Sequence, residues 1–252
     1  MSKEDILLQK RFIELANRSF SQNMYTFTEF LTLSELDLFY QQKPQLNFAG
    51  VTVFGGVEET DRKMIRFGNP DELGYEEDFP ICCIAIEPVM DKFAENLTHR
   101  DYLGALMNLG IGRENLGDIF VKDKRGYVFC LERIAEYILD NLSQVRHTQV
   151  KLRILNIFEE NIKKEIEEMA ILSASERIDG VISKIYNFSR SQSMELFRAK
   201  KIYVNSRLCE NNSYQLKVTD TVSVRGFGKF VYEGIQYETK KGKLSIKIGI
   251  YR

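Results

Sequence analysis

The arrangement of apolar residues between positions 81 and 155 constrains the fold of this chain most. Apolar residues here occur either in strand-like runs and alternations or at the spacing of one helical face. The strand-like segments are 81–86, 118–121, 127–131 and 150–155, and the helical ones are 99–109 and 134–142. The resulting order, β-α-β-β-α-β, predicts the ferredoxin-like split βαβ fold that RNA-recognition (RRM-like) domains share.

The flanking regions predict an α+β chain with two further modules. Residues 1–40 have helical spacing that ends at Lys43-Pro44, and short strand-like runs follow at 50–56 and 63–68. The stretch FEENIKKEIEEM predicts a charged connector helix with Ile162, Ile166 and Met169 on one face. The expected parts are a small N-terminal α/β domain at 1–75, the RRM-like domain at 76–156, the connector helix at 157–172 and a C-terminal domain at 173–252.

The C-terminal domain is expected to hold two short helices followed by antiparallel strands. The helices are predicted at 174–186 and 190–201, and KKGKLSIKIGIYR at the chain end is typical of a hairpin arm. Ser173-x-x-Glu176 and Ser189-x-x-Gln192 both match the capping box, in which a serine and a Glu or Gln satisfy the first free N–H groups of a helix.

Charge is distributed unevenly along a chain whose net charge is only −1. Residues 171–252 contain 15 lysines and arginines against 7 acidic residues, whereas residues 1–170 contain 20 against 29. A basic third on an acidic body indicates a polyanionic partner, most often a nucleic acid. A basic surface without a partner is the alternative.

The stretch NFSRSQSMELFRAKKIYVN, residues 187–205, concentrates this positive charge. Capping explains Ser189 and Gln192 but not the cations. Helical spacing places Arg190, Arg198 and Lys201 in one stripe, and it places Arg177 and Lys184 on one face of the preceding helix. Cations beside a helix N-terminus favour phosphate, because free N–H groups and guanidinium groups both bind its oxygens. A solvated basic face remains possible.

The same residues resemble the S4 RNA-binding domain. Arg177-Ile178-Asp179, Ser189-Arg190-Ser191-Gln192, Ile202-x-Val204-Asn205 and Asp220-x-Val222 match successive elements of its pattern. Lys200 and Thr219 stand where that family usually has glycine. With the matching elements, the candidate RNA-binding residues are Arg177, Lys184, Ser189, Arg190, Ser191, Gln192, Arg198, Lys200, Lys201, Asn205, Arg225 and Lys229.

The resemblance extends to the YlmH family of bacterial proteins. HRDYLGALMNLGIGRENLGDIFV, residues 99–121, and RGFGKF, residues 225–230, carry it together with the S4-like pattern. The resemblance implies an S4 domain behind an RRM-like middle domain and binding to ribosomal RNA of the large subunit, near tRNA or peptidyl-tRNA. It also implies a role in rescue or quality control of stalled translation, with genes that lie among cell-division genes.

Two aromatic residues of the middle domain are candidates for base stacking. Arg125-Gly126-Tyr127-x-Phe129 resembles part of an RNA-recognition motif on the third strand, where Tyr127 and Phe129 share one face. If that face is outward, the two rings can stack on bases. If it is inward, both belong to the core.

Nothing in the sequence indicates catalysis, a cofactor or a metal site. The two histidines stand apart from any nucleophile motif, and the four cysteines lack metal-ligand spacing. No apolar run approaches the ~20 residues of a membrane span, and the start does not resemble a signal peptide, so we expect a cytoplasmic monomer. The rival hypotheses are an RNA-modifying enzyme with an unrecognised active site and a cell-division interaction protein.

Overall fold

The computed structural model describes residues 3–155 and 166–251 of an α+β chain with antiparallel sheets. The chain forms two compact units, Met1–Lys163 and Lys164–Arg252. The expected boundary near residue 75 therefore does not separate independent bodies. Within the described ranges, the helices are too short or too polar to cross a membrane.

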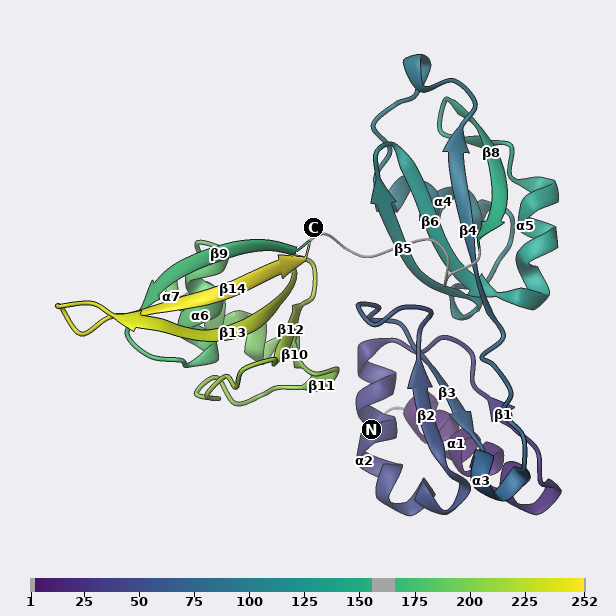
Figure 1. Ribbon diagram of the computed structural model, residues 1–252, viewed down its shortest axis with the longest axis horizontal. Helices are drawn as coiled ribbons and strands as arrows, with labels where there is room; N and C mark the ends of the chain where they lie inside the picture. The colour runs from purple at the N-terminus through teal and green to yellow at the C-terminus, as the bar shows by residue number, and fades with distance from the viewer. Residues whose placement is uncertain (1–2, 156–165, 252) are drawn as a thin grey trace. The chain divides into compact units, whose positions relative to one another are not determined.

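The first unit begins with a three-stranded sheet of order β1-β3-β2 covered by two helices (Figure 1). Its elements are α1 (Lys3–Gln22), β1 (Thr26–Phe27), α2 (Leu33–Leu46), η1 (Asn47–Ala49), β2 (Val51–Phe54), β3 (Met64–Phe67) and α3 (Pro70–Leu73). Phe12 of α1 and Phe39 of α2 pack edge to face, with ring centroids 5.6 Å apart, over buried Phe67. The strand-like runs at 50–56 and 63–68 are confirmed as β2 and β3.

The expected helical region 1–40 is wrong in two details. A turn at Asn23, which has a φ of +50°, ends the first helix, and strand β1 follows. The second helix starts at a capping box formed by Thr32 and Glu35 and continues through Pro44 to Leu46. Pro44 lies in the last turn, where its missing N–H removes only one helical hydrogen bond.

The six predicted segments of the middle region form the expected elements. They are β4 (Ile81–Pro88), α4 (His99–Asn108), β5 (Leu116–Lys122), β6 (Arg125–Leu131), α5 (Ala135–Asn141) and β8 (Thr148–Leu155), with 3₁₀ turns η2 (Asp91–Phe93), η3 (Arg113–Asn115) and η4 (Glu132–Ile134) and the short β7 (Gln144–Val145). The sheet order is β5-β6-β4-β8-β7, and all neighbouring strands are antiparallel. Its first four strands have the order of a split βαβ fold.

The two faces of this sheet are buried by different parts of the unit. Helices α4 and α5 cover one face, where Ile84, Val128, Tyr102 and Ile138 are fully buried. The other face is covered, at the end where β4 begins, by the N-terminal region through Phe30 and Met64. This contact joins the two sheets into one unit.

Phe129 of β6 lies at the centre of that contact and is fully buried. Its ring packs edge to face on Phe120, with centroids 5.5 Å apart. A Cβ at Gly56 would overlap the Phe129 ring, and a Cβ at Gly117 would lie 2.8 Å from both Phe129 and Phe30. The base-stacking prediction is therefore wrong for Phe129, which is a core residue, whereas Tyr127 is only partly buried against the same cluster.

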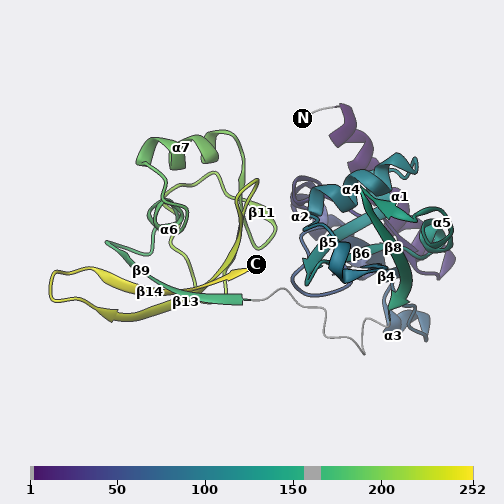
Figure 2. The same cartoon turned by 90° about the horizontal axis from the view of Figure 1, so that it is seen from above.

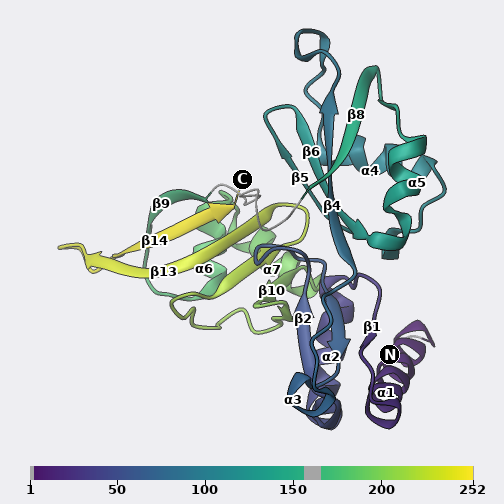
Figure 3. The same ribbon diagram turned by 45° about the vertical axis from the view of Figure 1, so that its right-hand side comes forward.

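The second unit is a six-stranded sheet with two helices on one side (Figure 2). Its elements are β9 (Ile166–Ser173), α6 (Ile178–Ile185), α7 (Arg190–Arg198), β10 (Ile202–Val204), β11 (Arg207–Leu208), β12 (Thr221–Val224), β13 (Gly228–Glu238) and β14 (Leu244–Tyr251). The sheet order is β11-β10-β12-β13-β14-β9. The predicted C-terminal hairpin is confirmed as β13 and β14 (Figure 3).

The expected connector helix is wrong over residues 166–172, which form strand β9 along β14. Burial alternates along this segment as it does in a strand. Ile171 and Ser173 are buried, whereas Glu168 lies on the other face, 2.8 Å from Lys247 of β14. Pairing with a neighbouring strand therefore overrides local helix propensity. The remainder of the predicted connector, including Ile162, lies outside the described residues.

The capping box predicted at Ser173 is also wrong. Helix α6 begins at Ile178, with Arg177 as its N-cap residue. The Ser173 hydroxyl donates instead to the Ser175 carbonyl at 2.7 Å, and the Glu176 carboxylate accepts from the Tyr232 hydroxyl.

Replacing Phe129 with alanine should lower the free energy of unfolding of the first unit by about 3–5 kcal/mol, because it leaves a cavity in a closed contact. Urea unfolding followed by fluorescence or circular dichroism measures this change. Phe93→Ala is the matched control: Phe93 is 73% exposed, so its loss should change stability by less than about 0.5 kcal/mol. Unaltered stability of Phe129→Ala would contradict the buried position.

Candidate nucleic-acid interface

An open pocket of about 410 Å³ lies between α6 and α7 of the second unit. Each helix buries one apolar face, Ile178, Val181, Ile182 and Ile185 in α6 and Leu196 and Phe197 in α7. The polar faces that remain supply the pocket lining. Three of the predicted RNA-binding residues, Arg177, Lys184 and Arg190, meet in that lining.

Arg177 is held at the start of α6 by an acidic partner. Its Nε and Nη2 donate to the two carboxylate oxygens of Asp179 at 3.1 and 2.7 Å. Burial raises the pKa of the Asp179 carboxyl, but hydrogen bonds from Arg177 and from the Gly180 N–H, with the charge of Arg190, outweigh it and bring the pKa below its ordinary value. The pocket is therefore net positive at neutral pH.

The predicted capping box at the start of α7 is confirmed. The Gln192 N–H donates to the Ser189 hydroxyl at 3.3 Å, and the Ser189 N–H donates to the Gln192 side-chain oxygen at 2.8 Å. The Ser191 hydroxyl lies 3.0 Å from that of Ser189. The Ser189 and Gln192 side chains are therefore used in capping the helix. Of the four residues of this motif, Arg190 lines the pocket.

The predicted stripe of Arg190, Arg198 and Lys201 does not form. Helix α7 ends at Arg198, and Lys200 has a φ of +54°, so helical spacing does not extend to Lys201. Arg198 lies 3.9 Å from Glu195, and Lys200 lies 3.3 Å from Glu210. The Lys201 carbonyl accepts from the Arg225 N–H at 2.9 Å, so these two basic residues are neighbours at the other end of α7.

Two other residues that were predicted to bind RNA, Asn205 and Lys229, use their side chains in contacts within the second unit. The Asn205 amide donates to Asp220 at 2.8 Å and accepts from the Thr221 N–H at 2.9 Å, so it joins two turns. Lys229 is only 9% exposed, and its ammonium lies 5.4 Å from the centre of the Tyr251 ring. The expectation that Lys229 contacts RNA is therefore wrong in this structure, because its side chain is buried.

Sequence reasoning missed an aromatic cluster beside these helices. Tyr186 stacks on Phe188 with centroids 5.6 Å apart, and Phe227 packs on Phe188 at 4.8 Å. Phe227 is half exposed in the turn between β12 and β13. The signal in the sequence was the RGFG stretch: Gly226 and Gly228 both have positive φ, so the phenylalanine between them sits at a turn tip.

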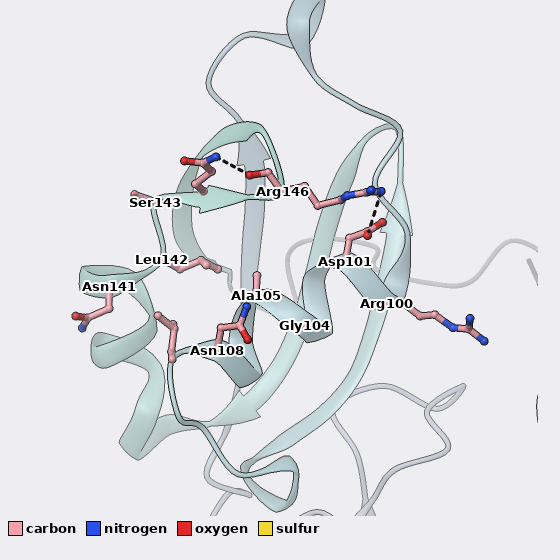
Figure 4. Close-up of a pocket in the computed structure, with 11 residues that line it drawn as sticks. Arg100, Asp101, Gly104, Ala105, Asn108, Asn141, Leu142, Ser143 and Arg146 are labelled. Carbon is pink, nitrogen blue, oxygen red and sulfur yellow. Dashed lines mark hydrogen bonds and ion pairs between the residues drawn. The ribbon is translucent and has the colours of Figure 1, made fainter.

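A second pocket, of about 500 Å³, lies between α4 and the segment from Asn141 to Arg146 in the first unit (Figure 4). Asp101 accepts from the Thr98 N–H and hydroxyl and lies 3.4 Å from Arg146. These contacts, the Thr98 hydrogen bonds first, lower the pKa of Asp101, which makes it a weak base. Among the residues described, no group of three histidine, cysteine or acidic side chains is placed to hold a metal ion.

The family model described as the putative RNA-binding domain in YlmH matches residues 75–159. The chain is 30% identical over 197 residues to the ribosome-associated protein quality control protein P2 of Bacillus subtilis (strain 168), covering 77% of this chain and 75% of that one. A solved structure, the cell division protein YlmH from Streptococcus pneumoniae, aligns with 22% identity and a TM-score of 0.48 over 64% of this chain and 96% of that one.

Thr219 and Lys200, which stand where glycine is usual in S4 domains, both have left-handed backbones, with φ of +76° and +54°. A non-glycine residue pays about 1–2 kcal/mol for this conformation. Thr219→Gly should therefore raise the free energy of unfolding by about 1 kcal/mol, after glycine's own entropic cost. Val218→Gly, in the same loop and without positive φ, should lower it; chemical denaturation of both variants tests the difference.

Proposed function

The chain belongs to the YlmH family of RNA-binding proteins, and from this membership we propose that it acts in ribosome quality control by binding RNA of the large ribosomal subunit. The pocket between α6 and α7 is the observation that carries the proposal. Arg177, Lys184 and Arg190 converge there on a unit whose sequence is strongly basic. Guanidinium and ammonium groups at such a surface bind phosphate oxygens.

Each part of the chain has a separate role. Residues 173–252 act as an S4 domain that binds folded ribosomal RNA through the α6–α7 pocket. Lys201 and Arg225, at the far end of α7, extend the contact toward tRNA or peptidyl-tRNA. The middle region is an RRM-like domain, and the acidic N-terminal part faces away from RNA. The protein works as a monomer in the cytoplasm.

We propose a binding protein and not an enzyme. The pocket of the first unit has one carboxylate in its lining, Asp101, which Thr98 and Arg146 contact and whose pKa these contacts lower. A general base works best when its pKa lies near the working pH. The relative from Bacillus subtilis is named for ribosome-associated quality control, which agrees with a role in stalled translation.

Co-sedimentation with purified large ribosomal subunits tests the proposal. The double variant Lys184→Glu, Arg190→Glu should reduce the bound fraction at least about tenfold, because reversing two contacts to phosphate replaces attraction with repulsion. The bound fraction of the unaltered protein should rise when the subunits carry peptidyl-tRNA and should fall steeply with salt.

The matched control is Lys3→Glu, Lys10→Glu, which makes the same charge change on the exposed side of α1. It should leave the bound fraction unchanged. Equal recovery with small subunits, or equal binding by both double variants, would contradict the proposal. Binding to a cell-division protein that survives nuclease treatment would favour the interaction-protein alternative.

A further inference from the structure

Two cysteines of the first unit face each other across neighbouring strands of the middle sheet (Figure 1). Cys82 of β4 and Cys130 of β6 are direct partners in the antiparallel register, and their sulfur atoms lie 3.4 Å apart. Directly opposite residues on antiparallel strands have Cα atoms about 4.5–5.5 Å apart, which lies within the range of about 4.4–6.8 Å that a disulfide bridges. The fold thus places these sulfur atoms where a covalent bond can form without a change in strand pairing.

The other two cysteines are placed differently. Cys83 lies on the opposite face of β4, in the cluster that contains Phe129, and Cys209 lies in the second unit. The pair of Cys82 and Cys130 belongs instead to the apolar cluster between the sheet and the helices α4 and α5. Cys83, as the sequence neighbour of Cys82, therefore offers a direct comparison for the pair.

The two thiols of the pair are unequal. Cys82 retains 9% exposure whereas Cys130 is fully buried, so a small oxidant reaches the pair from the side of Cys82. The hydrogen bond from the Cys130 S–H to the Cys82 sulfur lowers the pKa of Cys82 and outweighs the opposite effect of burial. The same contact, with burial, raises the pKa of the Cys130 thiol. Cys82 is thus the residue that forms the thiolate, which is the nucleophilic form of cysteine.

We propose that Cys82 and Cys130 form a peroxide-sensitive modification site, at which a disulfide closes reversibly. The Cys82 thiolate attacks one oxygen of hydrogen peroxide, the O–O bond breaks, and the hydroxide that leaves takes up a proton to become water. The Cys130 sulfur then attacks the sulfur of the Cys82 sulfenic acid. The S–O bond breaks, and the hydroxyl group leaves with the Cys130 proton as a second water. Two thiols are oxidised to one disulfide, and one peroxide is reduced to two waters.

The disulfide protects the core in which the two cysteines lie. A buried thiol that is oxidised further becomes a sulfinic acid, whose charge would lie among apolar side chains such as Ile84 and Val128. A disulfide carries no charge, so the packing between the sheet and its helices is kept. This role goes beyond the proposed RNA binding and does not depend on it.

The position of the pair also makes the bond reversible. Cβ atoms of directly opposite residues lie about 4.5–5.5 Å apart, whereas a relaxed disulfide needs about 3.5–4.5 Å. The bond between Cys82 and Cys130 is therefore strained, and strained disulfides are readily reduced by thiols. Transient bonds of this kind are the ones that form in a reducing compartment.

The test treats the purified full chain with hydrogen peroxide and counts free thiols after denaturation. The chain has four cysteines, and the count should fall by two thiols and return in full after dithiothreitol. Mass spectrometry of a proteolytic digest should find the peptides of Cys82 and Cys130 linked. Fragmentation between residues 82 and 83 should assign the bond to Cys82.

Cys82→Ala and Cys83→Ala are the matched variants, because each removes one buried thiol from β4. Cys82→Ala should lose the linked peptide and Cys83→Ala should keep it, with thermal melts to establish that both are folded. The mapping of the unaltered chain decides the question even where a variant fails to fold. An unchanged thiol count, sulfinic acid at Cys82 without a linked peptide, a bond to Cys83, or a bond that joins two chains on a non-reducing gel overturns the inference.

Discussion

The first unit depends on one partly buried guanidinium group that joins its two sheets. Arg62 donates to the carbonyls of Leu116 and Phe30, both at 2.9 Å, and of Arg113 at 3.0 Å. Arg113 in turn donates to the Leu116 and Gly117 carbonyls. Burial, with the charge of Arg62, lowers the pKa of Arg113 to about 10, so Arg113 is still charged at neutral pH. Charges that are withdrawn from water in this way depend on their hydrogen bonds for stability.

These contacts decide which surfaces of the chain remain for a ligand. They hold the loop around Gly56 and Phe30 against Phe129, so that half of the sheet face is core. Basic and aromatic residues are then exposed in the other half. In the second unit the division is simpler, because the helices bury apolar faces on the sheet and present cations on their polar faces. The proposed RNA-binding surface thus consists of side chains that are not used in packing.

The sequence predicted the middle sheet well because each strand and helix there has a strong, uninterrupted period. The prediction failed for β9, where glutamates favour a helix locally but Glu168 pairs with Lys247 of β14, a strand that is distant in sequence. Phe129 could not be placed from its own strand, because alternation identifies a face and not what covers that face. Arg177, Lys184 and Arg190 were found because helix spacing and capping are local, whereas Lys201 was misplaced when the helix ended three residues earlier.

The Arg62 contact also bears on where the chain can be divided. The family match begins at residue 75, which cuts between Arg62 and its carbonyl partners on Leu116 and Arg113. A fragment that begins there would expose Phe120, Phe129 and Leu131 to water and would remove the Arg62 donor from the Arg113 carbonyl. Such a fragment is a unit of sequence homology without being an autonomous folding unit. A soluble piece of this region should need its N-terminal sheet, supplied either in the same chain or as a complementing peptide.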